Sequence, residues 1–172
     1  MNRARRQASI GRTAEKLYHA QLHLEAWAAL QTDEERFNRE AWAISYQESV
    51  LLHLELAWLS FLAELAEFYK LDRPRDLADL ERMLKAADIV APELITLSER
   101  WQERGDDLHD LQEAWSSLRV PPAENGKDTR PSAPAMIATA QESRGLGFDR
   151  LSQWWRALRA AIEAGRQQMQ EW

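Results

Sequence analysis

The apolar residues at the start of the chain follow a seven-residue period. Ile10, Leu17 and Leu24 form one row, and a second row lies three residues after each of them. Residues at this spacing line one face of an α-helix and pack against a neighbouring helix. We therefore predict a helix over residues 4–30.

The second predicted helix covers residues 34–69 and is the most apolar segment. Its main row is again heptad-spaced and consists of Phe37, Ile44, Leu51, Trp58 and Leu65. The second half is apolar nearly all round, which is typical of the central helix of a bundle. At about 1.5 Å per residue this helix would be about 54 Å long, so we expect it to be bent or to form the spine of an elongated bundle.

Three further helices are predicted after residues 71–74. A short one covers 75–87, a long one runs from Pro92 to residue 118, and the last covers 148–170. Residues 119–147 are rich in Pro, Ser and Gly and have no helical period, which predicts a long loop. The pattern predicts an all-α fold: an antiparallel up-down helical bundle of four long helices and one short helix, in a single domain over residues 1–172.

The composition excludes some functional classes without identifying one. A formal net charge of -6 disfavours non-specific binding to nucleic acid or to an anionic membrane. The absence of cysteine excludes a thiolate zinc site and a disulfide framework, and it suits a cytoplasmic protein. The apolar run 50–69 contains three glutamates, each of which would cost about 2.5–3.5 kcal/mol at a bilayer centre. We expect a buried core helix and no membrane span.

Arginines gather near the N-terminus. Arg3, Arg5, Arg6 and Arg12 lie within a stretch, residues 1–14, that carries no acidic residue. Such a cluster can steer an anionic partner such as nucleic acid or lipid toward the protein. The alternative is a solvated helix end without a binding role.

His19 and His23 are the first candidates for metal chemistry, because two imidazoles four residues apart on a helix can share one ion. On a helical wheel, however, both lie beside the apolar stripe, toward its rim or the solvent. Metal sites in bundles use inward-facing Glu-x-x-His pairs, a pattern that this sequence lacks. We therefore predict neither a metal site nor a cofactor, with surface coordination by Glu15 and the two histidines as the alternative.

Arg104 interrupts a row of leucines in the helix predicted to start at Pro92. An arginine buried in such a row requires an acidic partner. Glu48 and Glu55 lie on the apolar side of the helix predicted over 34–69. We predict a buried ion pair between Arg104 and one of these glutamates.

The segment RGDDLH contains an arginine, four intervening residues and a histidine, Arg104 and His109. It resembles the loose form of the ribonuclease motif of HEPN-type helical bundles. The resemblance implies metal-independent RNA cleavage with Arg104 and His109 at the site. Asp106 and Asp107 lie between them and would repel a phosphate backbone.

The chain contains eight tryptophans, most of which fall on or near the apolar stripes. Core packing accounts for those. Trp154 lies beside the stripe of the last helix, with Arg156 and Arg159 close by. We predict that it lies at the rim of the core, with stacking on single-stranded nucleic acid as the alternative.

Two stretches, KLYHAQLHLEAW (16–27) and SVLLHLELAWLSFLAELAEFYKL (49–71), resemble an uncharacterised gammaproteobacterial family of small helical proteins, a domain of unknown function. The resemblance lies mainly within residues 16–71. It implies a bacterial, cytoplasmic helical protein and carries no assigned activity. His53 lies in the second stretch, on the polar side of its helix, so we expect it to be solvated.

Motifs for phosphate loops, nucleophile elbows, dinucleotide binding and EF-hands are all missing from the sequence. This absence, the tryptophans and the long loop favour a non-enzymatic interaction module that binds a protein partner or itself. The alternative from another class is an RNA-cleaving or nucleic-acid-associated bundle that uses Arg104 and His109 or the N-terminal arginines.

Overall fold

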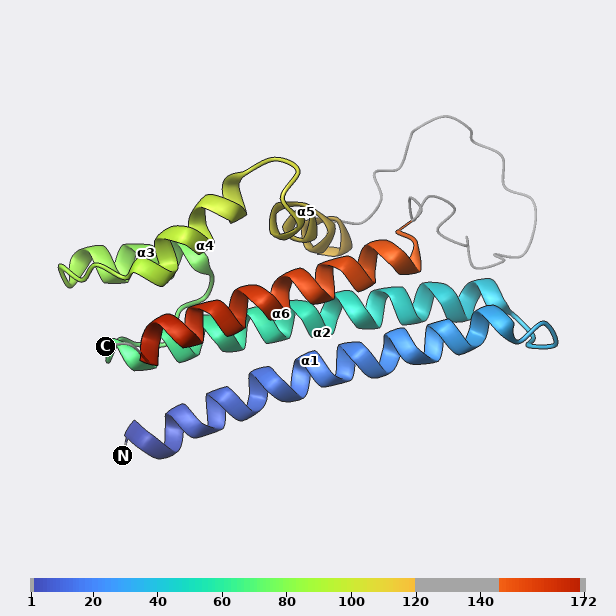
Figure 1. Cartoon of the computed structure of the whole chain (residues 1–172), viewed down its shortest axis with the longest axis horizontal. Helices are drawn as coiled ribbons and strands as arrows, with labels where there is room; N and C mark the ends of the chain where they lie inside the picture. The colour runs from blue at the N-terminus through green and yellow to red at the C-terminus, as the bar shows by residue number, and fades with distance from the viewer. Residues whose placement is uncertain (1, 120–145, 171–172) are drawn as a thin grey trace, which may run out of the picture.

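The computed structural model describes residues 2–119 and 146–170 and is all-α, as predicted. Most of the loop predicted over 119–147 lies outside these residues. Within the described ranges there are six helices and no strand (Figure 1). The helices are α1 (Asn2–Thr32), α2 (Arg39–Phe68), α3 (Leu77–Ala86), α4 (Pro92–Gln102), α5 (Asp107–Arg119) and α6 (Phe148–Gln170).

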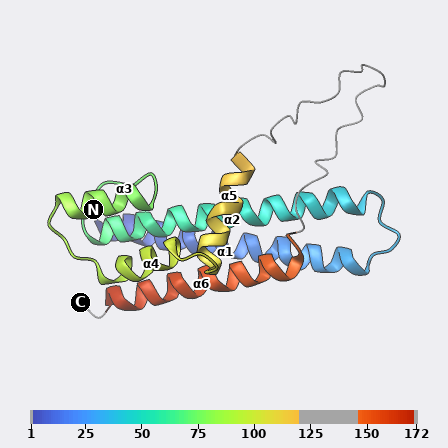
Figure 2. The same ribbon diagram turned by 90° about the horizontal axis from the view of Figure 1, so that it is seen from above.

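Three long helices, α1, α2 and α6, lie side by side along the length of the molecule (Figures 1 and 2). α1 and α2 form an antiparallel hairpin, and α6 runs in the same direction as α2. The second half of α2 is buried on nearly all sides, with Leu54, Phe61 and Leu62 fully inaccessible to solvent. The prediction that this apolar segment lies at the centre of the core is confirmed.

A turn joins α1 to α2 and shortens the predicted second helix. α2 begins at Arg39, after Asn38 in the left-handed region at φ 57°, a conformation that asparagine tolerates. Phe37 was predicted to join the apolar row but is 83% exposed, because it lies in the turn before the helix. The guanidinium of Arg39 donates to the carbonyls of Leu30 and Gln31, which satisfies the end of α1.

The prediction of a single long helix from Pro92 to residue 118 is wrong, because a turn interrupts it between α4 and α5. Glu103 is extended at ψ 111° and Gly105 has φ 91°, a value that favours glycine. The carboxylate of Asp106 then accepts a hydrogen bond from the N–H of Leu108 at 2.8 Å, which caps the start of α5. α5 crosses α2 and α6 steeply (Figure 2), so the predicted fourth long antiparallel helix does not form.

Contacts between tryptophan rings pack α4 and α5 against α2. The rings of Trp58 on α2 and Trp101 on α4 stack with centroids 4.5 Å apart. Trp115 on α5 lies 5.7 Å from Trp101 in a tilted arrangement. Aromatic pairs of this kind contribute about 0.5–1.5 kcal/mol beyond their buried area. The predicted core role of these tryptophans fits this arrangement.

α2 is long and apolar enough to cross a membrane by length and composition alone. In its most apolar window, however, 67% of the residues are buried inside the protein. A buried core helix meets the same criteria.

Candidate functional site

Arg104 was predicted to be buried but is exposed in the turn between α4 and α5. The predicted buried pair with Glu48 or Glu55 is therefore wrong. That prediction assumed an unbroken helix, and the break at Gly105 removes Arg104 from the leucine row. On α2, Glu48 is exposed and Glu55 is half-buried.

His109 on α5 directs both ring nitrogens at groups near it in the chain. Nδ1 lies 3.0 Å from the carbonyl oxygen of Trp101, to which it can donate, and Nε2 lies 3.6 Å from a carboxylate oxygen of Glu113. The contact with Trp101 fastens the end of α4 to α5, whereas the contact with Glu113 lies within α5. They do not direct His109 toward Arg104, so RNA cleavage by this pair stays a prediction.

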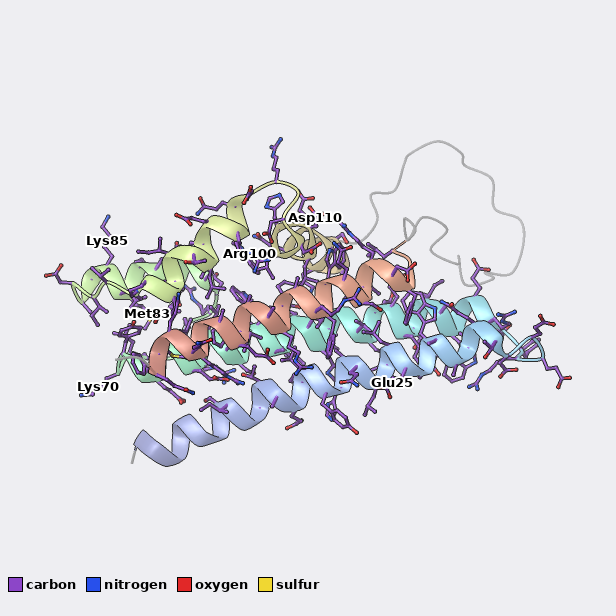
Figure 3. All side chains as sticks on the ribbon, viewed as in Figure 1. Glu25, Lys70, Met83, Lys85, Arg100 and Asp110 are labelled. Atoms are coloured by element: carbon purple, nitrogen blue, oxygen red, sulfur yellow. The ribbon has the colours of Figure 1, made fainter. Side chains whose placement is uncertain are left out.

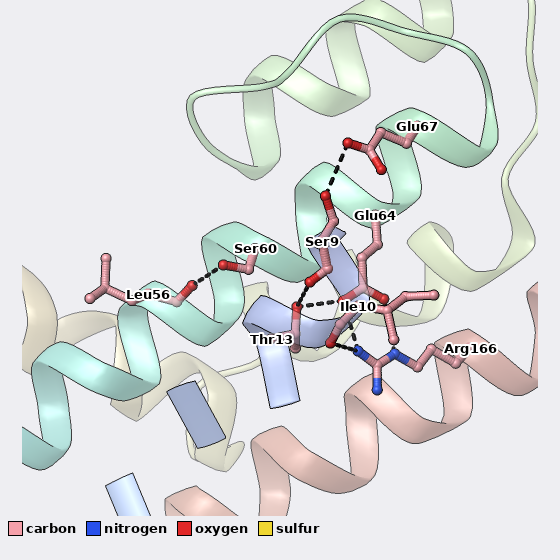
Figure 4. A network of polar contacts seen from close by, with 8 residues as sticks. All are labelled: Ser9, Ile10, Thr13, Leu56, Ser60, Glu64, Glu67 and Arg166. Carbon is pink, nitrogen blue, oxygen red and sulfur yellow. Dashed lines mark hydrogen bonds and ion pairs between the residues drawn. The ribbon is translucent and has the colours of Figure 1, made fainter. Parts of the chain in front are cut away.

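Two carboxylates are buried among the described residues, those of Glu64 and Glu93, and Glu64 of α2, only 1% exposed, lies between helices (Figure 4). Arg166 of α6 donates to both carboxylate oxygens, at 2.7 and 2.9 Å, in the bidentate geometry that arginine favours. The hydroxyl of Thr13 on α1 also donates to this carboxylate. Glu64 thus joins the three long helices, and its position among Leu62, Ala63, Leu65 and Ala66 was the sequence signal that could have revealed it.

Three histidines meet at the rim of the α1–α2 hairpin, which we call the histidine cluster: His19, His23 and His53. The ring centroid of His53 lies 5.1 Å from that of His19 and 5.3 Å from that of His23. The predicted rim position of His19 and His23 agrees with their half-buried state. His53 was predicted to be solvated but is also half-buried, because it faces α1. The cluster lines a pocket of about 480 Å³ together with Leu22, Ala26 and Tyr46.

Burial in this pocket favours the uncharged imidazoles of His23 and His53. Desolvation lowers the pKa of His53, and the charges of His23, His19 and Lys16 lower it further, against the opposing effect of Glu15. Desolvation and then the charge of His19 lower the pKa of His23. The Nδ1 atom of His53 is buried and has no hydrogen-bond partner among the described residues. No group of three or more His, Asp or Glu side chains among the same residues is placed to hold a metal ion.

The remaining predicted binding residues give no common site. Arg3, Arg5 and Arg6 belong to the first turns of α1, and their side chains lie outside what the structure describes. Trp154 is only 2% exposed, so stacking of its ring on nucleic acid is excluded in this fold. It is deeper than the predicted rim because α6 packs against four other helices and buries a face wider than one stripe. At the rim, its neighbour Trp155 donates to the carbonyl of Leu17 at 3.0 Å.

A second pocket, of about 520 Å³, lies between α3 and α4 and is named here the α3–α4 groove. Val90 and Ile95 line it and are 77% and 54% exposed, which is high for aliphatic side chains. The charged and polar groups of its rim include Lys85, which projects outward from α3 (Figure 3). The full lining consists of Glu81, Leu84, Lys85, Asp88, Ile89, Val90, Ala91, Leu94, Ile95, Ser98, Glu99 and Gln102.

Comparison with known proteins identifies a family to which no function is assigned. No curated protein and no solved structure matches the chain. A family model covers nearly all of it, which extends well beyond the 16–71 segment on which the resemblance was based. The chain belongs to a family of unknown function, DUF6586, whose model matches residues 8–172.

Proposed function

We propose that this protein is a non-enzymatic interaction module that binds an amphipathic helix of a partner protein in the α3–α4 groove. The observation that carries the proposal is the exposure of Val90 and Ile95 beside the apolar floor of the groove. Covering such side chains gains about 25 cal/mol per Å² of apolar surface. An amphipathic helix with apolar residues at positions i, i+3, i+4 and i+7 is a recurrent occupant of apolar grooves.

The charges around the groove indicate what the partner helix carries. The rim holds three carboxylates, on Glu81, Asp88 and Glu99, against one ammonium group, on Lys85. A partner helix with lysines or arginines beside its apolar stripe would complement this rim. Two copies of this chain facing each other through the same groove would bring like charges together, which disfavours self-association there.

The groove has a firm floor and an accessible position. Leu84 and Leu94 are buried beneath it, and the hydroxyl of Ser98 on α4 donates to Glu81 on α3. These contacts support the groove without a partner, so binding requires little reorganisation.

The groove is also accessible, because α3 and α4 stand to one side of the α1–α2–α6 bundle (Figure 1), where a helix can approach them. The cysteine-free sequence supports a cytoplasmic location for this interaction.

The test is a binding titration of the isotope-labelled protein with two designed helical peptides, followed by NMR. Both peptides carry the same leucine stripe, and one has lysines where the other has glutamates. We expect the lysine peptide to bind at least tenfold more tightly and to shift the resonances of groove residues. Equal affinity of the two peptides, or shifts located elsewhere, would contradict the proposal.

Two matched variants locate the binding surface. Ile95→Lys places a cation in the groove and is expected to weaken binding of the lysine peptide at least tenfold, because it removes apolar surface and repels the lysines. Leu52→Lys makes the same kind of change at an exposed position of α2, outside the groove, and is expected to leave binding unchanged. Light scattering completes the test, because a dimer that Ile95→Lys dissociates would identify the occupant as a second copy and overturn the proposal.

A further inference from the structure

We propose that the histidine cluster binds one divalent transition-metal ion, with His19, His23 and His53 as its protein ligands. This site lies on the α1–α2 hairpin and is independent of the α3–α4 groove. Three of the four histidines of the chain belong to it, two from α1 and one from α2.

The spacing of the rings fits a shared ion. With metal–nitrogen bonds of about 2.1 Å and tetrahedral angles, the centroids of two coordinated imidazoles lie about 5 Å apart. The centroid distances from His53 are 5.1 Å to His19 and 5.3 Å to His23. The ring of His53 therefore lies at this spacing from both α1 histidines.

Ring orientation is the part that binding must change. The rings of His23 and His53 are nearly parallel, at 15°, so their nitrogen lone pairs run side by side and do not meet at one point. In these side-chain conformations, no group of three ligand-type residues in the described part of the chain is placed to hold an ion. The rings are half-buried beside a pocket, which leaves room for rotation about their side-chain torsions without a shift of the helices.

The surroundings favour ligation over simple packing. The buried Nδ1 atom of His53 lacks a partner among the described residues, and an unpaired buried polar atom costs about 1–3 kcal/mol that a ligand could recover. Glu15 places a carboxylate oxygen 4.0 Å from Nδ1 of His19, which is longer than a hydrogen bond but close enough to attract a cation bound at the cluster.

The ligand set selects a class of ions. Imidazole nitrogens suit Zn²⁺, Ni²⁺ and Cu²⁺, whereas Mg²⁺ and Ca²⁺ require oxygen ligands. Three protein ligands leave a fourth position that water from the pocket can fill. An ion bound in this way would link α1 to α2 and stabilise the hairpin.

The primary experiment is isothermal titration of the full chain, purified without a polyhistidine tag, with ZnCl₂. We expect one ion per chain and a rise in melting temperature with added Zn²⁺. His53→Gln is expected to weaken Zn²⁺ binding at least tenfold. His109→Gln is the matched control, since it removes the one histidine outside the cluster, and is expected to leave the affinity unchanged.

Two results would overturn the proposal. Binding without saturation near one ion per chain would identify adventitious surface binding. Unchanged affinity in His53→Gln would mean that His19 and His23 act as a simple surface pair. His19→Gln, with the helical content of each variant checked by circular dichroism, separates loss of a ligand from loss of the fold.

Co²⁺ gives a second readout, visible absorption, which would not depend on His53 if its role were only structural. A tetrahedral site with three imidazoles and water gives intense visible d–d absorption, whereas an octahedral, mostly hydrated ion absorbs weakly. We expect intense absorption at one equivalent of Co²⁺, abolished in His53→Gln and retained in His109→Gln. Weak absorption in the parent protein would also contradict the site.

Discussion

Two polar clusters lie on the same α1–α2 hairpin and differ in how their polar atoms are satisfied. Glu64 is buried and receives hydrogen bonds from Thr13 and Arg166 on two other helices. In the histidine cluster, Nδ1 of His53 is buried without a partner in the described part of the chain. The carboxylate of Glu64 is satisfied as it stands, whereas the His53 ring has unused ligating capacity.

The position of α6 accounts for this difference. Arg166 brings α6 over the hairpin beside Glu64 (Figure 4), so the carboxylate is enclosed by three helices. The pocket at the histidine cluster is lined by residues of α1 and α2 alone. A polar group enclosed by three helices serves the fold, whereas one left at the rim of two helices stays available to a ligand.

The largest predicted effect comes from removing the partner of the enclosed charge. Arg166→Met leaves Glu64 buried without its cation, which is expected to lower the free energy of unfolding by about 3 kcal/mol. Urea unfolding measures this loss. A double variant, Glu64→Leu with Arg166→Met, should recover most of it, because well-packed apolar residues can replace a buried ion pair. A loss below about 1 kcal/mol in Arg166→Met would show that water solvates Glu64.

The next effect tests how closely α6 covers this side of the hairpin. A Cβ atom at Gly165 would lie 2.7 Å from Cζ of Phe61 on α2. Gly165→Ala is therefore expected to lower the free energy of unfolding by about 2 kcal/mol through overpacking. Gly11→Ala is the control, since a Cβ there meets nothing within 4 Å and alanine favours the helix by about 1 kcal/mol. Destabilisation by both variants would refute the packing explanation.

A smaller effect is expected from the histidine cluster, on how the stability of the metal-free protein depends on pH. The pKa values of His23 and His53 are lower in the folded chain, so the unfolded chain binds more protons just below the ordinary histidine value of about 6.5. Stability should therefore fall as the pH decreases through about 6.5, and then level off below the folded pKa values. Thermal unfolding in EDTA between pH 8 and 5 measures this. A profile that stays equally steep in His53→Gln would assign the dependence to other groups.

Treating the hairpin as a unit would have shown that His53 can face the first helix, but not which residues it meets. The predicted helices, 4–30 and 34–69, place the turn near residue 32 and position 53 opposite position 11. The observed helices end at Thr32 and begin at Arg39, so the turn lies later in the chain and His53 lies beside His19 and His23. A wheel drawn for one helix at a time places each histidine at a rim but does not show that the rims coincide.

The Glu64–Arg166 pair and the α4–α5 break were harder to predict. Arg166 follows the segment 119–147, which is too long to fix the register of α6 against α2. At Gly105, a helical glycine costs only about 1 kcal/mol, so an unbroken helix looked acceptable. The Asp106 cap and the stacking of Trp101 on Trp58 favour the break, and both depend on contacts that spacing along one helix does not reveal.

The smallest predicted effect concerns Ser9, whose hydroxyl donates to Glu67 at 3.0 Å beside the enclosed cluster. Ser9→Ala removes the hydrogen bond to Oε1 of Glu67, whose Oε2 is already buried without a partner among the described residues, but the half-buried side chain can rotate toward the surface. Alanine also favours the helix by a few tenths of a kcal/mol, so we expect a net loss of only about 0.5 kcal/mol in urea unfolding. A loss as large as that of Arg166→Met would instead place Glu67 with Glu64, as a second charge that the fold encloses and must satisfy.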